Sequence, residues 1–540
     1  MPNIYVNALF AAIKANDEPR AQNAIVAIIG MKSFHDQFVK GSNQPVDIKD
    51  EMGLDVFNEE GMTPLMVAIK NNRQNIVNLL LHSGADIHKI GLNGATTIGC
   101  AAYANNLELV DSLLTQHVNL NYEDTFFSYT PLKCAVNHNN PEMVQKLLNA
   151  GVIDDIHNLY KLLCNAIKKN DVNSYKIVTA LLHANPDLSD GASIYLAASL
   201  NNAETVIALI NARPQADTNW RDRQDNEYHT TLSWAMRHKN ITILKALLNV
   251  DPKHDERSPA NPNRHTKFLE MTPLYRAVSL GNIEMVKLLL EAGADPKEST
   301  DDYPDPLLCW AINADIENKE EIVRLLAEKA EPDGTSIYLA ARLNHAEIVI
   351  ALLNARPQAE TDWRFQEEED ERHTALTWAV RHENIKMLKA LLNVDPKHNE
   401  RSPADPNRHA KHLTMTPLHR AVSLGNIEMV ELLLEAKADP DIADKSKLTP
   451  LMTAAENKHK QEDAQIVSLL LGNKADVNII HDNKTALSIA INAEQTFIVS
   501  LLLLACPTDP HLKLLQVFAP GQNQSDPVII QCLTALLSNP

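Results

Sequence analysis

The sequence predicts an all-α solenoid, in which short helix pairs stack in a row and each pair packs against the next. The first observation is a pattern of about 33 residues that recurs along most of the 540-residue chain, most fully as MTPLYRAVSLGNIEMVKLLLEAGAD at 271–295. The second is that each copy holds two short segments with apolar residues at helical spacing. The third is composition: hydrophobic residues make up 44% and aromatic residues only 5%, as expected where Leu, Ile and Ala pack thin helices together.

The opening of the repeat predicts a short helix with a sharp start. The hydroxyl of Thr272 is placed to cap this helix, and Pro273 takes the first helical position, where its missing N–H costs nothing. Leu274, Ala277 and Val278 follow at i, i+3 and i+4 and form one apolar stripe. The small Ala277 side chain allows a neighbouring helix to approach closely.

The rest of the repeat predicts a turn, a second helix and a loop. Gly281-Asn282 supplies the turn, residues 283–290 carry the second apolar stripe, and Gly293 suits a left-handed helix end before a finger loop that starts at Ala294-Asp295. Such a pair is too small to close its own core, so it is stable only between neighbours. The T-P-L-x-x-A opening, the V-x-x-L-L-L run and the G-A-D close resemble the ankyrin repeat. The resemblance implies a curved ankyrin-repeat solenoid with finger loops, several of them enlarged.

About thirteen copies of the repeat can be recognised. Clear copies open with Thr-Pro-Leu at Thr63, Thr130, Thr272, Thr416 and Thr449. Degenerate copies open at 95–98, 193–196, 229–232, 306–308, 336–339, 373–376 and 484–487, and a more diverged copy lies at 162–166.

The copies divide the chain into four parts. Residues 1–30 are expected to form an N-terminal capping helix pair, and residues 31–58 an extended linker. Residues 59–505 form the ankyrin-repeat array, and residues 506–540 a C-terminal cap or tail. Atypical ends are expected because one face of a terminal repeat meets water.

Within the array, residues 191–296 recur as 334–440 with mostly conservative changes, an offset of 143 residues from Ser193 to Ser336 that spans four repeats. The loop DPKHDERSPANPNRHTK at 251–267 and its copy DPKHNERSPADPNRHAK at 395–411 share 14 of 17 positions. Recent duplication of a block explains this identity. A binding feature held by both loops is the alternative.

No motif of a catalytic site is present. The sequence lacks a G-x-x-x-x-G-K phosphate loop, an H-E-x-x-H zinc helix and a G-x-S-x-G elbow, and it has only 16 glycines. A fused catalytic domain would need about 100 residues of non-repeat sequence, which the unassigned segments do not offer. We therefore expect no enzyme activity and no cofactor.

Charge and cysteine content bear on the partner and the compartment. The formal net charge of −19 argues against nucleic acid, since phosphate binding needs concentrated basic residues. The six cysteines are well separated, which favours a reducing, cytoplasmic location; Cys100, Cys134, Cys164 and Cys309 are interpreted as small core residues of first helices. No apolar run approaches the length of a membrane span, and no secretory leader is expected.

Five histidines in the duplicated loops are candidate metal ligands. Zinc would need three or four converging ligands, and Asp255 of one duplicated loop is Asn399 in the other, so loop histidines that face a partner are favoured over a metal site. His419 lies in a repeat opening, where the ankyrin family often has a histidine that bonds between repeats, and a structural role is expected for it. The loop histidines are His254, His265, His398, His409 and His412.

The resemblance implies that a protein partner binds at the concave face made by first helices and finger tips. Trp220 and Trp363 occupy matching places where fingers begin, and aromatic residues often carry binding energy; packing against their own enlarged loops is the alternative. Lengthened fingers at 211–229 and 250–270, with their copies, add reach at little cost in stability. The predicted contact residues are Trp220, Arg221, Arg264, His265, Trp363, Arg408 and His409.

The other three tryptophans, Trp234, Trp310 and Trp378, directly precede the recurring alanine of a first helix. Packing is favoured at this position. Exposure on the concave floor is the alternative.

The expected function is that of a protein-protein interaction scaffold or adaptor. The long irregular array, the duplicated block and the Asn-, Lys- and Ile-rich composition resemble ankyrin proteins that intracellular bacteria deliver into host cells, which implies action on host proteins in the host cytoplasm. The tail at 532–540 is then either a translocation signal or a capping helix. The alternatives are a regulatory or inhibitory docking arm for a separate enzyme and, behind it, a cryptic enzyme.

Overall fold

The computed structural model describes the chain as helices joined by turns and short loops. It covers residues 3–39, 53–120, 130–152, 155–220, 229–249, 259–264, 271–297, 306–363, 373–393, 403–408, 415–457, 461–482 and 484–505, with side chains of the first segment described up to residue 33. These residues form 28 α-helices, as the sequence predicts, and extended pairing among them is limited to one bridge between His481 and Lys484. The chain divides into two compact units, 1–261 with 266–268 and 262–265 with 269–540.

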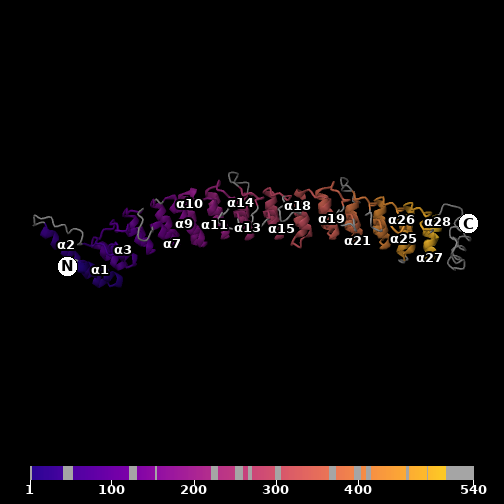
Figure 1. The fold of residues 1–540 in the computed structure, drawn as a ribbon. Coiled ribbons are helices and arrows are strands. Elements are labelled where there is room, and N and C mark those ends of the chain that lie inside the picture. Colours follow the sequence, from indigo (N-terminus) through magenta and orange to yellow (C-terminus); the bar gives the residue numbers. More distant parts are fainter. Residues whose placement is uncertain are drawn as a thin grey trace. The chain divides into compact units, whose positions relative to one another are not determined.

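The first unit begins with a helix hairpin and continues with six helix pairs (Figure 1). The hairpin is α1 (Asn3–Ala15) and α2 (Glu18–Val39). The first helices of the pairs are α3 (Pro64–Lys70), α5 (Thr97–Tyr103), α7 (Pro131–Asn137), α9 (Ile156–Lys169), α11 (Gly191–Ser199) and α13 (Thr231–Arg237). The second helices are α4 (Gln74–His82), α6 (Leu107–Leu114), α8 (Pro141–Asn149), α10 (Val172–Ala184), α12 (Ala203–Ala212) and α14 (Ile241–Leu248), with a short 3₁₀ turn η1 (Pro186–Leu188) after α10.

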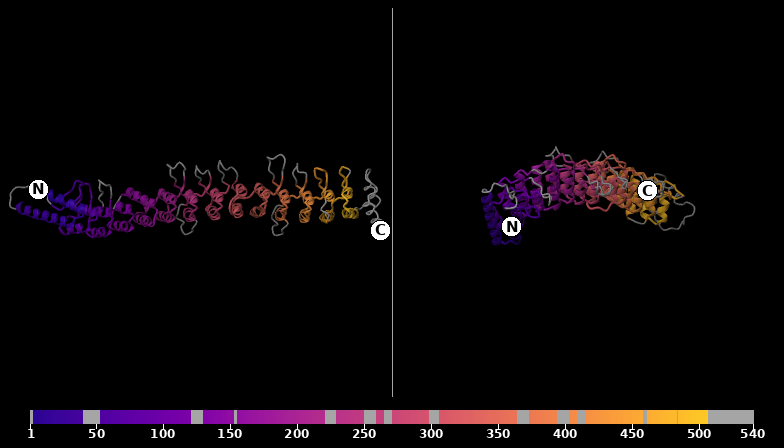
Figure 2. Two further views of the ribbon diagram at one scale, coloured as in Figure 1. Left: turned by 90° about the horizontal axis from the view of Figure 1, so that it is seen from below. Right: turned by 60° about the vertical axis from the view of Figure 1, so that its left-hand side comes forward.

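The second unit consists of seven pairs, which brings the total to the thirteen that the sequence predicts. Its first helices are α15 (Pro273–Ser279), α17 (Leu307–Asn313), α19 (Gly334–Arg342), α21 (Ala375–Arg381), α23 (Pro417–Ser423), α25 (Pro450–Glu456) and α27 (Ala486–Asn492). Its second helices are α16 (Ile283–Glu291), α18 (Lys319–Ala330), α20 (Ala346–Ala355), α22 (Ile385–Leu392), α24 (Ile427–Glu435), α26 (Gln461–Gly472) and α28 (Thr496–Ala505). Within each unit, successive pairs lie side by side in a row (Figure 2).

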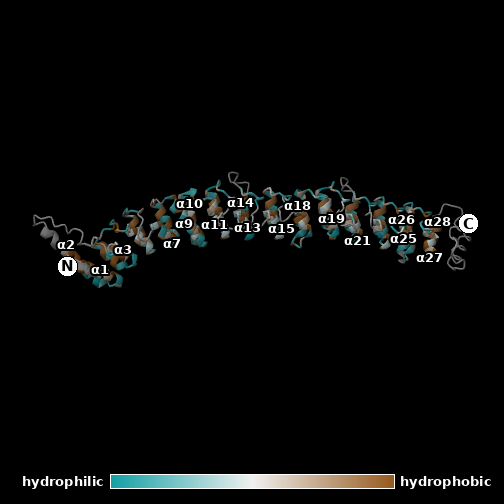
Figure 3. Cartoon of the chain, viewed as in Figure 1, coloured by the Kyte–Doolittle hydropathy of each residue, from teal (hydrophilic) through white to brown (hydrophobic). Residues whose placement is uncertain are grey.

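The core lies in the seams between pairs. Helix α19 packs against its own partner α20 and also against α17 and α21, the first helices on either side. The recurring alanine sits at these seams: Ala277, Ala340, Ala379 and Ala421 are completely buried. Hydrophobic residues follow the helices, whereas hydrophilic residues gather at the turns and fingers (Figure 3). The two predicted apolar stripes therefore serve packing between repeats.

Caps and turns follow the predicted chemistry. The Thr272 hydroxyl accepts a hydrogen bond from the Tyr275 backbone N–H, and Pro273 stands at the first position of α15. The turn residue Gly281 and the helix end Gly293 both have positive φ, 64° and 86°. In most other pairs an asparagine such as Asn344, with φ of 61°, takes the left-handed turn position.

A ladder of asparagine side chains ties consecutive turns together. The Asn384 side chain caps α22 and also donates from Nδ2 to Oδ1 of Asn344, at 2.8 Å. Asn240 and Asn201 make the same contact, again at 2.8 Å, in the first unit. In these repeats the turn is thus bonded to the preceding one.

The N-terminal hairpin is longer than predicted. The sequence places a linker from residue 31, but α2 continues to Val39. Nothing lies within 4 Å of a Cβ built at Gly30, so this glycine stands in an open part of the helix and costs only about 1 kcal/mol in helix propensity.

Trp220 and Trp363 close a joint between a finger and the start of a first helix. A Cβ placed on Gly334, the first residue of α19, would lie 2.3 Å from Cβ of Trp363 and 2.7 Å from the Glu360 carbonyl oxygen. Gly191 of α11 stands in the same relation to Trp220, at 2.5 Å. Glycine is required at both positions because the tryptophan occupies the space of a side chain.

His419 bonds between repeats, which confirms the structural role predicted for it. Its imidazole is completely buried, with Nδ1 2.7 Å from the Thr416 hydroxyl and Nε2 2.8 Å from the carbonyl oxygen of Leu448 in the next repeat. A carbonyl only accepts, so the network assigns the proton to Nε2, and Nδ1 accepts from Thr416.

Replacing His419 by alanine is expected to lower the free energy of unfolding by about 2–3 kcal/mol, because the Leu448 carbonyl loses its donor and a cavity remains. Urea unfolding followed by circular dichroism measures this loss. The control is His138→Ala, which removes a bond of the same kind to the Tyr103 carbonyl, 2.8 Å long but solvent-exposed. Equal losses in the two variants would contradict the prediction.

Replacing Gly334 by alanine is expected to destabilise the second unit by about 1–3 kcal/mol, because Trp363 must move away from the new methyl group. The midpoint of unfolding followed by tryptophan fluorescence tests this. The control is Gly472→Ala at the end of α26, where nothing lies within 4 Å of the added Cβ and no loss is expected. A Gly334 variant as stable as the control would show that the joint adapts freely.

Candidate protein-binding surface

Each unit presents two kinds of exposed surface to a partner, the outward sides of its first helices and its fingers. In the second unit, Trp378 of α21 is the centre of a cluster on the first helices. Its ring stacks on His382, with centroids 5.6 Å apart, and lies 4.7 Å from the ring of His373. The Arg381 guanidinium lies 5.1 Å from the centroid of the Trp378 ring and donates to Nε2 of His373 at 3.3 Å.

The first unit contains the same cluster on α13. His229 and His238 flank the Trp234 ring at 4.6 and 5.7 Å, and the Arg237 guanidinium lies 5.2 Å from its centroid. The indole N–H groups of Trp234 and Trp378 are both buried and have no acceptor among the described residues. Trp310 packs on Tyr275 at 4.7 Å. Packing, the favoured interpretation for these three tryptophans, is what the structure shows, with each side chain half-buried.

The finger tryptophans also pack, while part of each stays accessible. Besides the glycine joint, Trp220 makes an edge contact with Tyr195 at 5.0 Å, and Trp363 lies 5.4 Å from Tyr338. Both tryptophans are half-buried. The alternative interpretation for these two tryptophans is packing against their own enlarged loops. The contacts of both are packing contacts, but they are made with the first helix of the same repeat. The partner-binding role stays a prediction.

The two finger arginines stand in short turns. Arg408 is 44% exposed and forms a 3.7 Å ion pair with Asp362, the neighbour of Trp363. Arg264 is half-buried. The structure therefore places Arg408 beside the Trp363 finger, as a shared surface would require. The other predicted contact residues, Arg221, His265 and His409, lie outside the described residues, as do the five histidines weighed as metal ligands.

The described part of each duplicated loop packs against the neighbouring repeat structure. The Ala404 N–H donates to the Leu391 carbonyl at 2.9 Å, and Ala404 is buried. Asn407 accepts from the backbone N–H of Asp439 in the next finger at 2.7 Å. The equivalent Asn263 accepts from the N–H of Asp295 at 2.8 Å. These contacts give the shared S-P-A-x-P-N-R sequence a packing reason that does not depend on a ligand.

A cavity of about 450 Å³ opens between α7 and α9 in the first unit, lined by Thr130, Lys133, Asn158, Tyr160, Lys161, Leu162, Cys164, Asn165 and Lys168. Its possible nucleophile is Cys164, but burial raises the pKa of this thiol, so the thiol is protonated near neutral pH. Burial likewise raises the pKa of the Tyr160 hydroxyl, which lies 3.4 Å from Asp190. The remaining charged lining is three lysines, which suits the binding of an anion.

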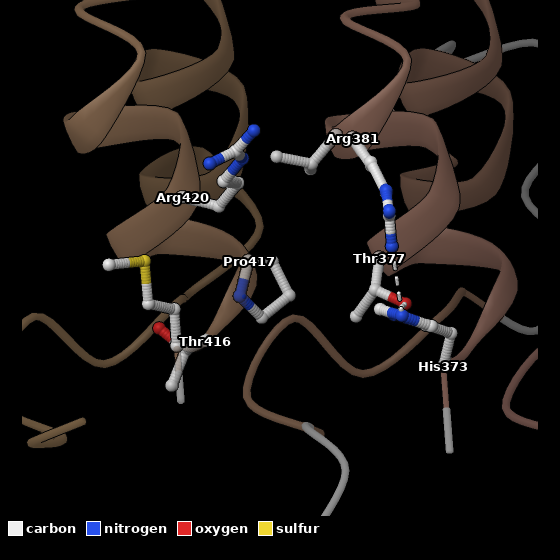
Figure 4. Close-up of a pocket in the computed structure, with 8 residues that line it drawn as sticks. His373, Thr377, Arg381, Thr416, Pro417 and Arg420 are labelled. Atoms are coloured by element: carbon white, nitrogen blue, oxygen red, sulfur yellow. Dashed lines mark hydrogen bonds between the residues drawn. The ribbon is translucent and has the colours of Figure 1, made fainter. Parts of the chain in front are cut away.

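The second unit has a smaller cavity, of about 250 Å³, between α21 and α23 (Figure 4). Arg381 runs along α21 to His373, and Arg420 and Pro417 face it from α23 (Figure 4). Its residues are His373, Thr377, Val380, Arg381, Met415, Thr416, Pro417 and Arg420. No carboxylate is among the described residues that line either cavity.

The sequence reasoning missed the arginines and lysines of the first helices. Arg237, Arg342 and Arg381 stand at the position of Ser279, two residues after the recurring alanine, and Arg276 and Arg420 stand directly before that alanine. Counting charge at these positions rather than over the whole chain would have found them.

Two further properties concern the described part of the chain. No group of three or more His, Cys, Asp or Glu residues within it is placed to hold a metal ion. No helix there combines the length and apolarity needed to cross a bilayer.

Known proteins resemble the chain in its repeats. A family model for ankyrin repeats in three copies matches residues 6–90, 98–192, 194–300, 308–402, 359–444, 400–481 and 418–513. The chain is 25% identical to inversin of Homo sapiens over 255 residues, which is 45% of this chain and 22% of inversin. It is 28% identical over 234 residues to the putative ankyrin repeat protein FPV115 of Fowlpox virus, covering 42% of this chain and 39% of the viral protein.

A third relative is the ankyrin repeat and KH domain-containing protein mask-1 of Caenorhabditis elegans, 24% identical over 287 residues, covering 45% of this chain and 11% of that protein. The chain thus spans less than half the length of each of these relatives. The matches to the repeat family, in contrast, run with short gaps from residue 6 to residue 513, in step with the thirteen helix pairs. The chain therefore belongs to the ankyrin-repeat family.

Proposed function

We propose that this chain is a protein-protein interaction scaffold or adaptor, which holds a protein partner against its first helices and enlarged fingers. One observation carries the proposal. The apolar residues of each first helix are buried in the seams between pairs. The remaining positions of the first helices are therefore at the surface, and they recur from one pair to the next. A partner then meets variable side chains on a rigid frame, the arrangement that binding surfaces commonly use.

The finer proposal is that the partner is a host protein and that the chain is a bacterial effector acting in host cytoplasm. The duplicated block and the Asn-, Lys- and Ile-rich composition support it. This role predicts that the full chain, fused to a reporter enzyme that acts only in host cytosol, gives a signal when a bacterium with a host-directed secretion system carries it. A signal that persists when that system is disabled would contradict the effector role.

Affinity capture tests the scaffold function. The immobilised full chain is expected to retain a defined protein from a cell lysate, identified by mass spectrometry. Replacing Arg264 and Arg408 together by alanine is expected to weaken retention about tenfold, which corresponds to ~1.4 kcal/mol, because finger arginines contribute to the contact.

The matched control removes two positive charges from second helices, Lys287→Ala with Lys386→Ala, and is expected to bind normally. Circular dichroism shows that both variants are folded. A chain that retains no more protein than bare resin would contradict the scaffold function. Equal retention by the finger variant and the control would contradict only the assignment of Arg264 and Arg408.

A further inference from the structure

Charge is divided unequally between the two helix layers. The first helices α3 to α27 together carry ten Lys and Arg residues and a single acid, Glu456. The second helices α4 to α28 carry nine Lys and Arg and fifteen Asp and Glu. A protein with a net charge of −19 thus keeps one helix layer almost purely basic.

The second-helix layer neutralises its own cations. Lys389 of α22 pairs with Glu428 of α24 at 2.7 Å, Lys287 of α16 pairs with Glu321 of α18 at 3.5 Å, and Lys386 of α22 pairs with Glu347 of α20. Each pair bridges neighbouring repeats. In the first-helix layer Arg276, Arg342 and Arg420 form no ion pair with a described carboxylate, so their charge is available to a ligand.

The cavity between α21 and α23 concentrates this charge. Arg381 is held in place by stacking on Trp378 and by its bond to His373, and the guanidinium of Arg420 is exposed on the next first helix. A guanidinium fixed by aromatic stacking loses little entropy when it binds a carboxylate, and its planar fork matches the two carboxylate oxygens. With Arg420 it gives this cavity two guanidinium groups and no carboxylate among the described lining residues.

The first unit repeats the feature independently. Its larger cavity between α7 and α9 is lined by Lys133, Lys161 and Lys168 and by no acid among the described residues. Different cations in a different pair of first helices thus give a basic cavity in the same layer. Lys169 is a separate case, because its ammonium group donates to the carbonyl oxygens of Val136 and Asn137, both at 2.6 Å, at the end of α7.

We propose that the first helices of the second unit bind an extended segment of the partner rich in Asp and Glu, with one carboxylate seated between Arg381 and Arg420. The proposal rests on the protein-recognition function and specifies the chemistry of the partner. Packed helices lie about 9 Å apart, close to three residues of extended chain at about 3.3 Å each. An acidic residue at every third position would therefore meet one first helix after another.

A nucleic acid is the competing polyanion. It carries a phosphate at every nucleotide and meets the field of the whole chain, which is strongly negative. A peptide presents its few charges only where the first helices supply a cation. The observations therefore favour a peptide, and RNA enters the test as a competitor.

The test begins with selection of a displayed library of random 12-residue peptides on the full-length chain. Enrichment of Asp and Glu, spaced by about three residues, is expected. The best acidic peptide is then measured by fluorescence anisotropy against the full-length variants R381Q/R420Q and R420Q. We expect the double variant to bind about tenfold more weakly and the single variant several-fold more weakly.

The matched control is K386Q/K389Q, which removes two charges from the second helix of the same repeat and is expected to bind as the unchanged protein does. The single R420Q variant guards against a folding defect, because Arg420 does not take part in the Trp378 cluster. The variant R420E should lose the acidic peptide and regain affinity for a peptide in which one Glu is changed to Lys. That rescue would establish direct contact.

Three results would overturn the proposal. One is an enriched pool without acidic residues, and another is an acidic peptide that binds R381Q/R420Q and the control equally. The third is stronger binding of a single-stranded RNA 12-mer than of the acidic peptide. None of these results touches the scaffold function, which falls only if the lysate capture recovers no partner.

Discussion

The inability of a single helix pair to bury its own apolar residues governs this molecule. Each pair has a core only because its neighbours supply the other half, and the alanines at 277, 340, 379 and 421 mark how closely first helices approach. The strongest contacts therefore run along the row, between equivalent positions of consecutive repeats. The asparagine ladder, the finger bonds such as Asn407 to Asp439, and the His419 bridge all add polar contacts in that same direction.

Because packing uses only the seams, the two outer layers are free to differ. The second-helix layer places opposite charges on neighbouring repeats, as at Lys389 and Glu428, and so adds modest support to the stack. In the first-helix layer, Arg237 and Arg381 instead lie against tryptophan and histidine rings. Several cations of the second helices are thus paired between repeats, whereas Arg276, Arg342 and Arg420 of the first helices form no ion pair with a described carboxylate.

The architecture could be predicted almost completely from the sequence, because each repeat contains recognisable helix caps, apolar stripes and turn residues. Thirteen pairs and the Thr caps follow from local patterns, and the role of His419 follows from the resemblance to the ankyrin repeat. Contacts between segments that are distant in the sequence could not be predicted from these local patterns. The place of Trp220 was visible, but not that it covers Gly191, 29 positions earlier, since that depends on how the finger folds back. The basic layer was hidden because net charge averages over both layers, and the length of α2 because an exposed Gly30 does not end a helix.

The joints between fingers and first helices bear on how such a chain lengthens. Gly191 and Trp220 both belong to the block 191–296, and Gly334 and Trp363 both belong to its copy at 334–440. The two complementary shapes are inherited together when the segment is copied, so a new insertion arrives already fitted and needs no compensating substitution in older parts of the protein. Modules that contain both halves of their own tight contacts are the ones an array can multiply in one genetic event.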